Sequence, residues 1–175
     1  MSLANTFIRF PLAAAMLAAM GTSSGGATRS GGGGQDEAEV CECGMVARDD
    51  MPVPALEAIV REAGGLDFGP VTTFEREGAQ FFTADMVRDG HVTGVEVDAA
   101  GAVKSVSTEI EAWELPVAVK RVVDAETLGF PARSFVVRTT GSETLYLVDA
   151  ATERRGKQLE IDPQGRVVNK VLKIS

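Results

Sequence analysis

The chain has 175 residues, a formal net charge of −8 at pH 7 and a sequence pI near 4.7. This length allows one ordinary domain or two very small ones. The acidic balance argues against a nucleic-acid partner, because neutralising phosphates requires a basic surface.

The first predicted element is an export signal. Residues 11–20 form an apolar run, with the single basic residue Arg9 before it. Such a run is too short to span a bilayer comfortably but has the length of a signal-peptide core. Small residues follow, so cleavage is expected after Gly21 or Ala27, and the alternative is an N-terminal anchor that is never cut. The sequence therefore predicts export to the periplasm or the cell exterior, with no stable membrane span after cleavage of residues 1–27.

A flexible tether is predicted for residues 28–50, which are first rich in glycine and serine and then acidic. It contains the two cysteines, Cys41 and Cys43. Thiols at this spacing can chelate a soft ion such as Cu(I) or zinc, form an easily reduced disulfide, or bridge to another chain. The alternative is an oxidised or idle pair. We therefore treat Cys41 and Cys43 only as weak metal candidates and predict no cofactor.

Charge is distributed unevenly over the remainder of the chain. Residues 54–114 carry 4 Lys and Arg against 12 Asp and Glu, whereas residues 115–175 carry 10 against 7. One interpretation is that the two halves attract each other. The other is that the acidic half presents a surface to a basic partner.

Residues 51–114 begin with a helix pattern and continue with strand patterns. Leu56, Ile59, Val60 and Ala63 have the spacing of one buried helix face, and two glycines end the helix. Alternating or β-branched segments then predict strands at 71–77, 79–88, 91–98 and 102–110.

The same order of patterns recurs in residues 115–175. A proline opens a second helix with a stripe at Val119, Val122 and Val123. Strands are predicted at 134–140, 143–151, 156–162 and 166–174. Residues 95–103 also recur 64 positions later as residues 159–167, each with an aspartate and a glycine that are typical of a tight turn.

These patterns predict an α+β fold of two tandem repeats, each a helix packed on a four-stranded antiparallel meander. Alternation sorts the strand residues into two faces. The residues expected to face the helices are Phe82, Ala84, Met86, Val95, Val97, Tyr146, Val148, Ala150, Leu159 and Ile161. One helix cannot cover both faces of a sheet, so the opposite face is expected to be open to solvent or to a partner.

The quoted motifs resemble a known family. A helix opened by Leu115-Pro116, an aromatic strand at 146–150 and the hairpin at 159–167 are similar to the PepSY-like family, in the tandem form grouped with β-lactamase inhibitory protein. The resemblance covers residues 51–175 and divides them into PepSY-like repeats at 51–114 and 115–175. It implies exported, non-enzymatic proteins that bind and restrain other proteins. This chain lacks cysteines after Cys43, which separates it from the disulfide-closed inhibitor.

Little in the sequence indicates catalysis, so we predict that the protein is not an enzyme. The single histidine, His91, is expected to be a solvated hairpin residue. Asp85, Glu96, Asp149 and Glu160 fall on the open face, where carboxylates most often serve solubility.

The prediction from sequence is an exported, bacterial protein-binding module of unknown partner, acting as a propeptide-like or inhibitor-like restraint on an envelope or secreted protein. The alternatives are a structural envelope component and a soft-metal or redox protein that uses the cysteines. The predicted partner-binding residues are Phe81, Thr83, Glu96, Trp113, Leu145, Leu147 and Glu160. Trp113, the only tryptophan, is expected either to border this surface or to seal the junction between the two repeats.

Overall fold

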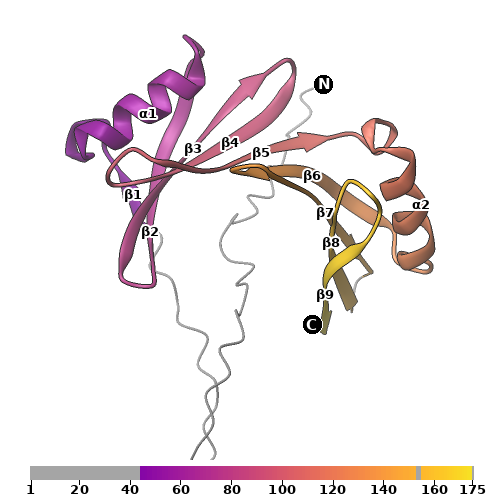
Figure 1. Cartoon of the computed structure of the whole chain (residues 1–175). Helices are drawn as coiled ribbons and strands as arrows, with labels where there is room; N and C mark the ends of the chain where they lie inside the picture. The colour runs from indigo at the N-terminus through magenta and orange to yellow at the C-terminus, as the bar shows by residue number, and fades with distance from the viewer. Residues whose placement is uncertain (1–43, 153–154, 175) are drawn as a thin grey trace, which may run out of the picture. The chain divides into compact units, whose positions relative to one another are not determined.

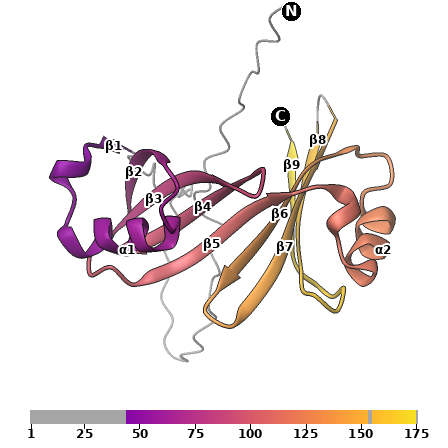
Figure 2. The ribbon, with the colours of Figure 1, turned by 90° about the horizontal axis from the view of Figure 1, so that it is seen from above.

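A computed structural model describes residues 44–152 and 155–174. Its elements in chain order are β1 (Gly44–Val46), η1 (Arg48–Asp50), α1 (Val53–Ala63), β2 (Phe68–Arg76), β3 (Ala79–Arg88), β4 (His91–Asp98), β5 (Val103–Ile110), η2 (Ala112–Glu114), α2 (Val117–Glu126), β6 (Ala132–Thr140), β7 (Glu143–Ala151), β8 (Arg155–Ile161) and β9 (Val167–Ile174). The nine strands of these residues form one antiparallel sheet whose order follows the chain from β1 to β9. Figures 1 and 2 show α1 and α2 near opposite ends of this sheet.

The predicted fold class is wrong. The described chain is mostly β, a single nine-stranded sheet with only two short helices, and not two tandem helix-on-meander repeats. The reason lies at β5 and β6, which pair from Val106 opposite Thr139 to Ile110 opposite Phe135. Local sequence patterns identify strands, but they do not show that two strands separated by a helix will pair their free backbone groups.

A short strand also extends the sheet at its N-terminal edge. β1 pairs with β2 over Gly44–Val46, which was not predicted to be a strand. In the following η1, Arg48 donates a hydrogen bond of 2.7 Å to the carbonyl of Phe68 and lies 4.0 Å from the centre of its ring. These contacts fasten the segment before Met51 to the start of β2.

The two helices form where the apolar spacing and the prolines predict them. Pro54 lies in the first turn of α1, where a missing N–H leaves no hydrogen bond unmade. The helix ends at Gly64, which has a φ of 61° and donates its N–H to carbonyls in the last turn. The buried residues of α1 are Ala55, Ala58, Ile59 and Ala63, whereas Val60, which was predicted to belong to the stripe, is 51% exposed.

The predicted strand positions and the residues facing the helices are confirmed. One core cluster joins α1 to Phe82 and its neighbours on β3 and β4, and a second joins α2 to Val148, Leu159 and Ile161. On β5, Val106 packs against the first cluster and Ile110 against the second. Residues an even number of positions apart lie on the same face of a strand, so Val106 and Ile110 share one face of β5. Both helices therefore cover the same face of the sheet.

The hairpin turns β4–β5 and β8–β9 each rest on the first turn of a helix. Gly101 and Gly165 have φ values of 81° and 84° in these turns. A Cβ atom added at Gly101 would lie 2.4 Å from the carbonyl oxygen of Pro54, and one at Gly165 would lie 2.8 Å from that of Ala118. Only glycine therefore lets each turn approach its helix this closely.

Candidate functional site

The candidate site is the sheet face opposite the helices, which we call the open face. Strand register places six of the seven predicted binding residues on it. Thr83 lies directly opposite Glu96, and Leu147 lies directly opposite Glu160. Phe81 and Leu145 share this face by alternation with Thr83 and Leu147. The predicted residues thus form two groups, one on β3 and β4 and one on β7 and β8.

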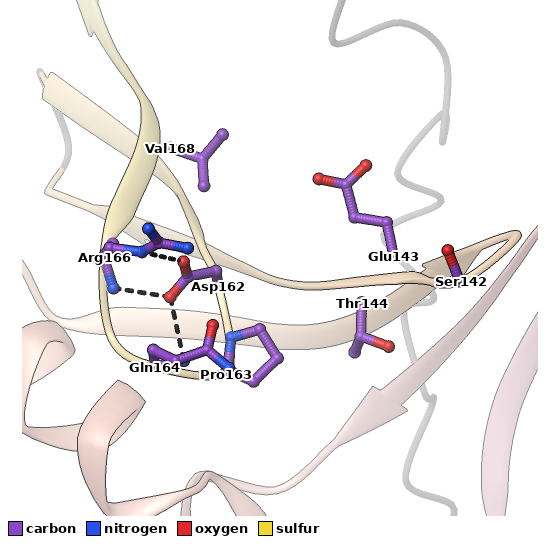
Figure 3. A pocket seen from close by; sticks show the side chains of 8 residues that line it. All are labelled: Ser142, Glu143, Thr144, Asp162, Pro163, Gln164, Arg166 and Val168. Atoms are coloured by element: carbon purple, nitrogen blue, oxygen red, sulfur yellow. Dashed lines mark hydrogen bonds and ion pairs between the residues drawn. The ribbon is translucent and has the colours of Figure 1, made fainter.

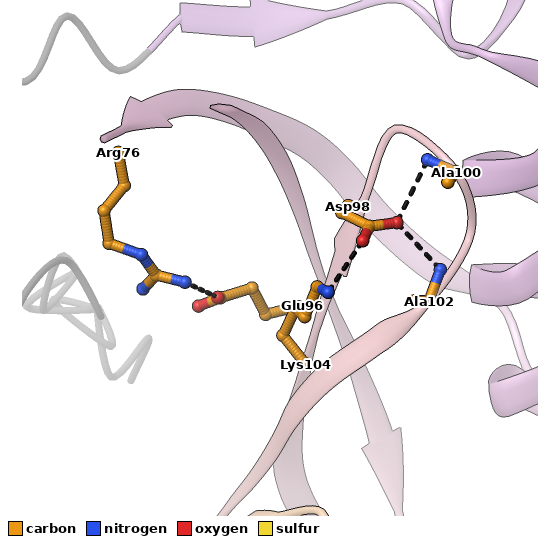
Figure 4. A network of polar contacts seen from close by, with 6 residues as sticks. All are labelled: Arg76, Glu96, Asp98, Ala100, Ala102 and Lys104. Atoms are coloured by element: carbon orange, nitrogen blue, oxygen red, sulfur yellow. Dashed lines mark hydrogen bonds and ion pairs between the residues drawn. The ribbon is translucent and has the colours of Figure 1, made fainter. Parts of the chain in front are cut away.

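In the first group an arginine links the aromatic and acidic side chains. The rings of Phe74 and Phe81 stack with their centres 5.5 Å apart, and the guanidinium of Arg76 lies 4.3 Å from the centre of the Phe81 ring. Arg76 also donates a hydrogen bond of 2.8 Å to Glu96 Oε1 (Figure 4). Phe81 is consequently only 7% exposed, although no helix covers it. Cation–π and charge-assisted contacts of this kind hold side chains in one geometry.

Sequence reasoning missed Arg76 and Phe74 as members of this group. Both lie on β2, which pairs with β3 so that Phe74 is directly opposite Phe81. Residues 71–77 were predicted to be a strand, so extending the face assignment to this strand would have found both residues.

The second group contains buried polar atoms. Glu160 is 5% exposed and accepts a hydrogen bond of 3.2 Å from Arg138 at Oε1. Arg138 stands between Ser107 and Leu145 in the strand register. Within the described residues, Glu160 Oε2 and Ser107 Oγ are buried without a hydrogen-bond partner. Buried acceptors of this kind destabilise the isolated protein, and any donor that reaches them is bound favourably.

Trp113, the seventh predicted residue, lies apart from both groups. It is in η2 and is 79% exposed, so it does not seal the junction. Leu115 is the buried residue there. Glu111 and Glu114 form a capping box around η2, and Glu114 Oε1 lies 3.5 Å from His91 Nε2. His91 is therefore half-buried beside a carboxylate and not a fully solvated hairpin residue.

Two aspartates at the rim of the sheet organise the turns after β4 and β8. Asp98 accepts hydrogen bonds from the N–H groups of Ala100 and Ala102 and pairs with Lys104 at 2.7 Å (Figure 4). The Lys104 ammonium and the Ala102 N–H lower the pKa of Asp98.

Asp162 repeats this arrangement at the β8–β9 turn. It accepts hydrogen bonds from the N–H groups of Gln164 and Arg166 and pairs with the Arg166 side chain at 2.5 Å. These donors, the Arg166 N–H first, lower the pKa of Asp162. The turn borders a depression of about 340 Å³. Ser142 of the β6–β7 turn and Glu143 and Thr144 at the start of β7 line its other side (Figure 3). None of the predicted binding residues lines this depression.

Other predicted chemistry finds no counterpart in the part of the chain that the structure describes. No group of three His, Cys, Asp or Glu side chains there is placed to hold a metal ion. Cys41 and Cys43 lie outside the described residues. No helix within residues 44–152 and 155–174 is long and apolar enough to cross a membrane.

No protein-family model matches this sequence, and no curated protein matches it. Solved structures do match. A DUF2874 family protein from Bacteroides uniformis has a TM-score of 0.60 and 19% identity, over 69% of this chain and 88% of that one. A protein from Bacteroides eggerthii that is described as periplasmic has a TM-score of 0.59 and 16% identity, over 70% and 88%.

A BLIP-like protein from Bacteroides fragilis has a TM-score of 0.55 and 17% identity, over 70% of this chain and 86% of that one. At such identities the likeness concerns the fold alone. The PepSY-like part of the predicted resemblance is named by none of these three neighbours and stays a prediction. The BLIP-like part is supported, because this chain shares its fold with the Bacteroides protein of that description.

Proposed function

We propose that this protein is an exported, non-enzymatic module that binds another protein through the open face of its sheet. The observation that carries the proposal is the state of that face. It bears aromatic, aliphatic and charged side chains without a covering helix, and its first group is held in place by the contacts of Arg76 with Phe81 and Glu96. Side chains that are already immobilised lose little conformational entropy on binding, so more of the contact energy appears as affinity.

The proposed action is an inhibitor-like or propeptide-like restraint on an envelope or secreted protein. Two findings about other proteins support it. The Bacteroides eggerthii neighbour is described as periplasmic, in agreement with the exported location predicted from residues 1–27. The Bacteroides fragilis neighbour is described as BLIP-like, and this agrees with the predicted inhibitor-like character.

The proposal is tested by capturing partners from an envelope fraction with the full chain and with variants of each sheet face. Thr83→Arg and Leu147→Arg place a bulky charge on the open face, where both residues are half-buried. Val117→Arg is the control, because Val117 is exposed on α2, which lies on the other face.

We expect a captured protein to be retained by the control and lost from both open-face variants, with unchanged circular dichroism spectra. Loss of a central contact typically weakens binding by about 2 kcal/mol or more, which is sufficient to remove a band from a capture experiment. A partner that binds all three variants equally would show that the open face is not the binding surface.

A further inference from the structure

Four side chains form a row across the open face. Glu109 on β5 is directly opposite Val136 on β6, which is opposite Leu147 on β7, which in turn is opposite Glu160 on β8. We call these four residues the β5–β8 row. Neighbouring strands are about 4.8 Å apart, so the backbones of the two glutamates are separated by about 14 Å. The row therefore has a carboxylate at each end and a half-buried aliphatic floor between them.

The two carboxylates of the row are not fully compensated. Within the described residues, no hydrogen bond or ion pair engages Glu109, whose side chain is exposed. Glu160 has one contact, from Arg138 to Oε1, and its Oε2 is buried without a partner. Ser107 Oγ, next to Arg138 in the register, is a second buried atom without a partner. The open face from β5 to β8 thus has acceptor capacity that the described residues do not use.

We infer that the protein bound at the open face presents two basic side chains on either side of an apolar one, and this rests on the proposed function. An extended segment advances about 3.3 Å per residue, so basic residues four positions apart span the distance between the two glutamates. The residue midway between them points to the same side and meets Val136 and Leu147.

The chemistry of Lys and Arg suits this row. Their aliphatic stems pack on apolar surface while their charged heads reach carboxylates. One head pairs with the exposed Glu109. The other donates to Glu160 Oε2, the buried acceptor that the described residues leave without a partner.

The inference is tested with a synthetic peptide and the full chain labelled with ¹⁵N. The probe is acetyl-Gly-Lys-Ala-Leu-Ala-Lys-Gly-amide, and the matched control peptide replaces both lysines by glutamine. We expect the lysine peptide to shift amide signals of β5 to β8 and to bind more weakly as ionic strength rises. The glutamine peptide should bind at least about fivefold more weakly, as expected for the loss of paired charges.

Three protein variants locate the contact. Glu109→Gln and Glu160→Gln should each weaken binding of the lysine peptide by about threefold or more, because each removes one charge and keeps the side-chain shape. Glu57→Gln, at an exposed position of α1 on the other face, should leave it unchanged. Melting temperatures of all three variants provide the check that the sheet remains folded.

Equal binding of the two peptides, or shifts confined to other strands, would overturn the inference. That result is separable from the proposed function. If the envelope partner is still lost from Leu147→Arg while both Glu→Gln variants retain it, the open face binds protein but does not select basic residues. If the lysine peptide binds the row and no open-face variant affects partner capture, the row binds basic peptides but the proposed function fails, and the inference about the partner fails with it.

Discussion

At the scale of single residues, Asp98 and Asp162 each form hydrogen bonds with the backbone N–H groups of the turn that they begin. Each carboxylate accepts hydrogen bonds from two backbone N–H groups. Each also forms an ion pair, Asp98 with Lys104 of the following strand and Asp162 with Arg166 of the turn. All of these donors favour the ionised form, and so the pKa of each aspartate lies below its ordinary value of 3.8.

Stability should therefore fall in acid because of these two groups. Their pKa values are lower in the folded than in the unfolded chain, so their contribution is complete above 3.8 and is lost as the pH falls through the folded-state pKa values. Urea unfolding measured as a function of pH should show this loss. Asp98→Asn and Asp162→Asn should each reduce the slope of the unfolding free energy against pH below the unfolded pKa.

Asp67→Asn is the control for this measurement, because Asp67 is exposed. An acid slope that is the same in the wild type and in both turn variants would show that the turn carboxylates do not contribute to it.

The open face shows what sequence can predict about a site. Alternation placed Phe81, Thr83, Glu96, Leu145, Leu147 and Glu160 on one face, and strand register agrees. The contacts of Arg76 and Arg138 were not predicted. They join side chains 20 and 22 positions apart in the chain, on strands that are not direct neighbours. Such contacts depend on side-chain reach across a strand, which period-two patterns do not encode.

At the scale of secondary-structure elements, the two hairpin turns fix where the helices begin relative to the sheet. Gly101 approaches the backbone of Pro54 in α1, and Gly165 approaches that of Ala118 in α2. Because the nearest atoms of both helices are backbone atoms, a side chain at either glycine can be accommodated only if the turn or the helix moves.

Gly101→Ala should lower the free energy of unfolding by about 2–4 kcal/mol, the sum of left-handed backbone strain and a clash with a helix. Gly141→Ala separates the two effects, since Gly141 has a φ of 59° but nothing within 4 Å of the added Cβ. The free energy of unfolding of this control variant should fall by only about 1–2 kcal/mol. If urea unfolding gives the same decrease in unfolding free energy for both variants, the added Cβ atom at position 101 does not clash with α1.

Elements were predicted better than their assembly. Period-two alternation located β2 to β9, and proline and glycine positions located both helices. β1 is only three residues long and follows a stretch of glycine and acidic residues, so it lacks a local pattern. The pairing of β5 with β6 joins two strands that are separated in the chain by η2 and α2. Sequence periodicity identifies each strand but does not indicate which strands pair.

At the scale of the molecule, one sheet connects two separate apolar cores. Thr93 and Thr108 lie on the helix-covered face between them and share a hydrogen bond of 3.1 Å. The continuous backbone ladder through β5 and β6 should therefore make the two halves unfold together.

Val97→Asp tests this coupling, because Val97 is fully buried in the core beneath α1. Burying a charge there should cost several kcal/mol. Hydrogen exchange should then show reduced protection of amides in β4 and also in β7, on the far side of the β5–β6 pairing. Val117→Asp, at an exposed position of α2, should leave the protection of amides in both β4 and β7 unchanged. If the loss of hydrogen-exchange protection is confined to β4, the parts of the sheet on the two sides of the β5–β6 pairing unfold independently.

The order of strands in the sheet has a consequence for how the chain acquires its structure. Each strand pairs with the one that precedes it in the sequence. The longest connections between paired strands are two of equal length, one through η1 and α1 and one through η2 and α2. Contact order is therefore low for a β-rich protein, and little loop-closure entropy opposes each pairing. A chain that emerges from a secretion channel with its N-terminal part first can add every strand to an existing edge as it appears. Folding of this protein should accordingly be fast and compatible with vectorial export.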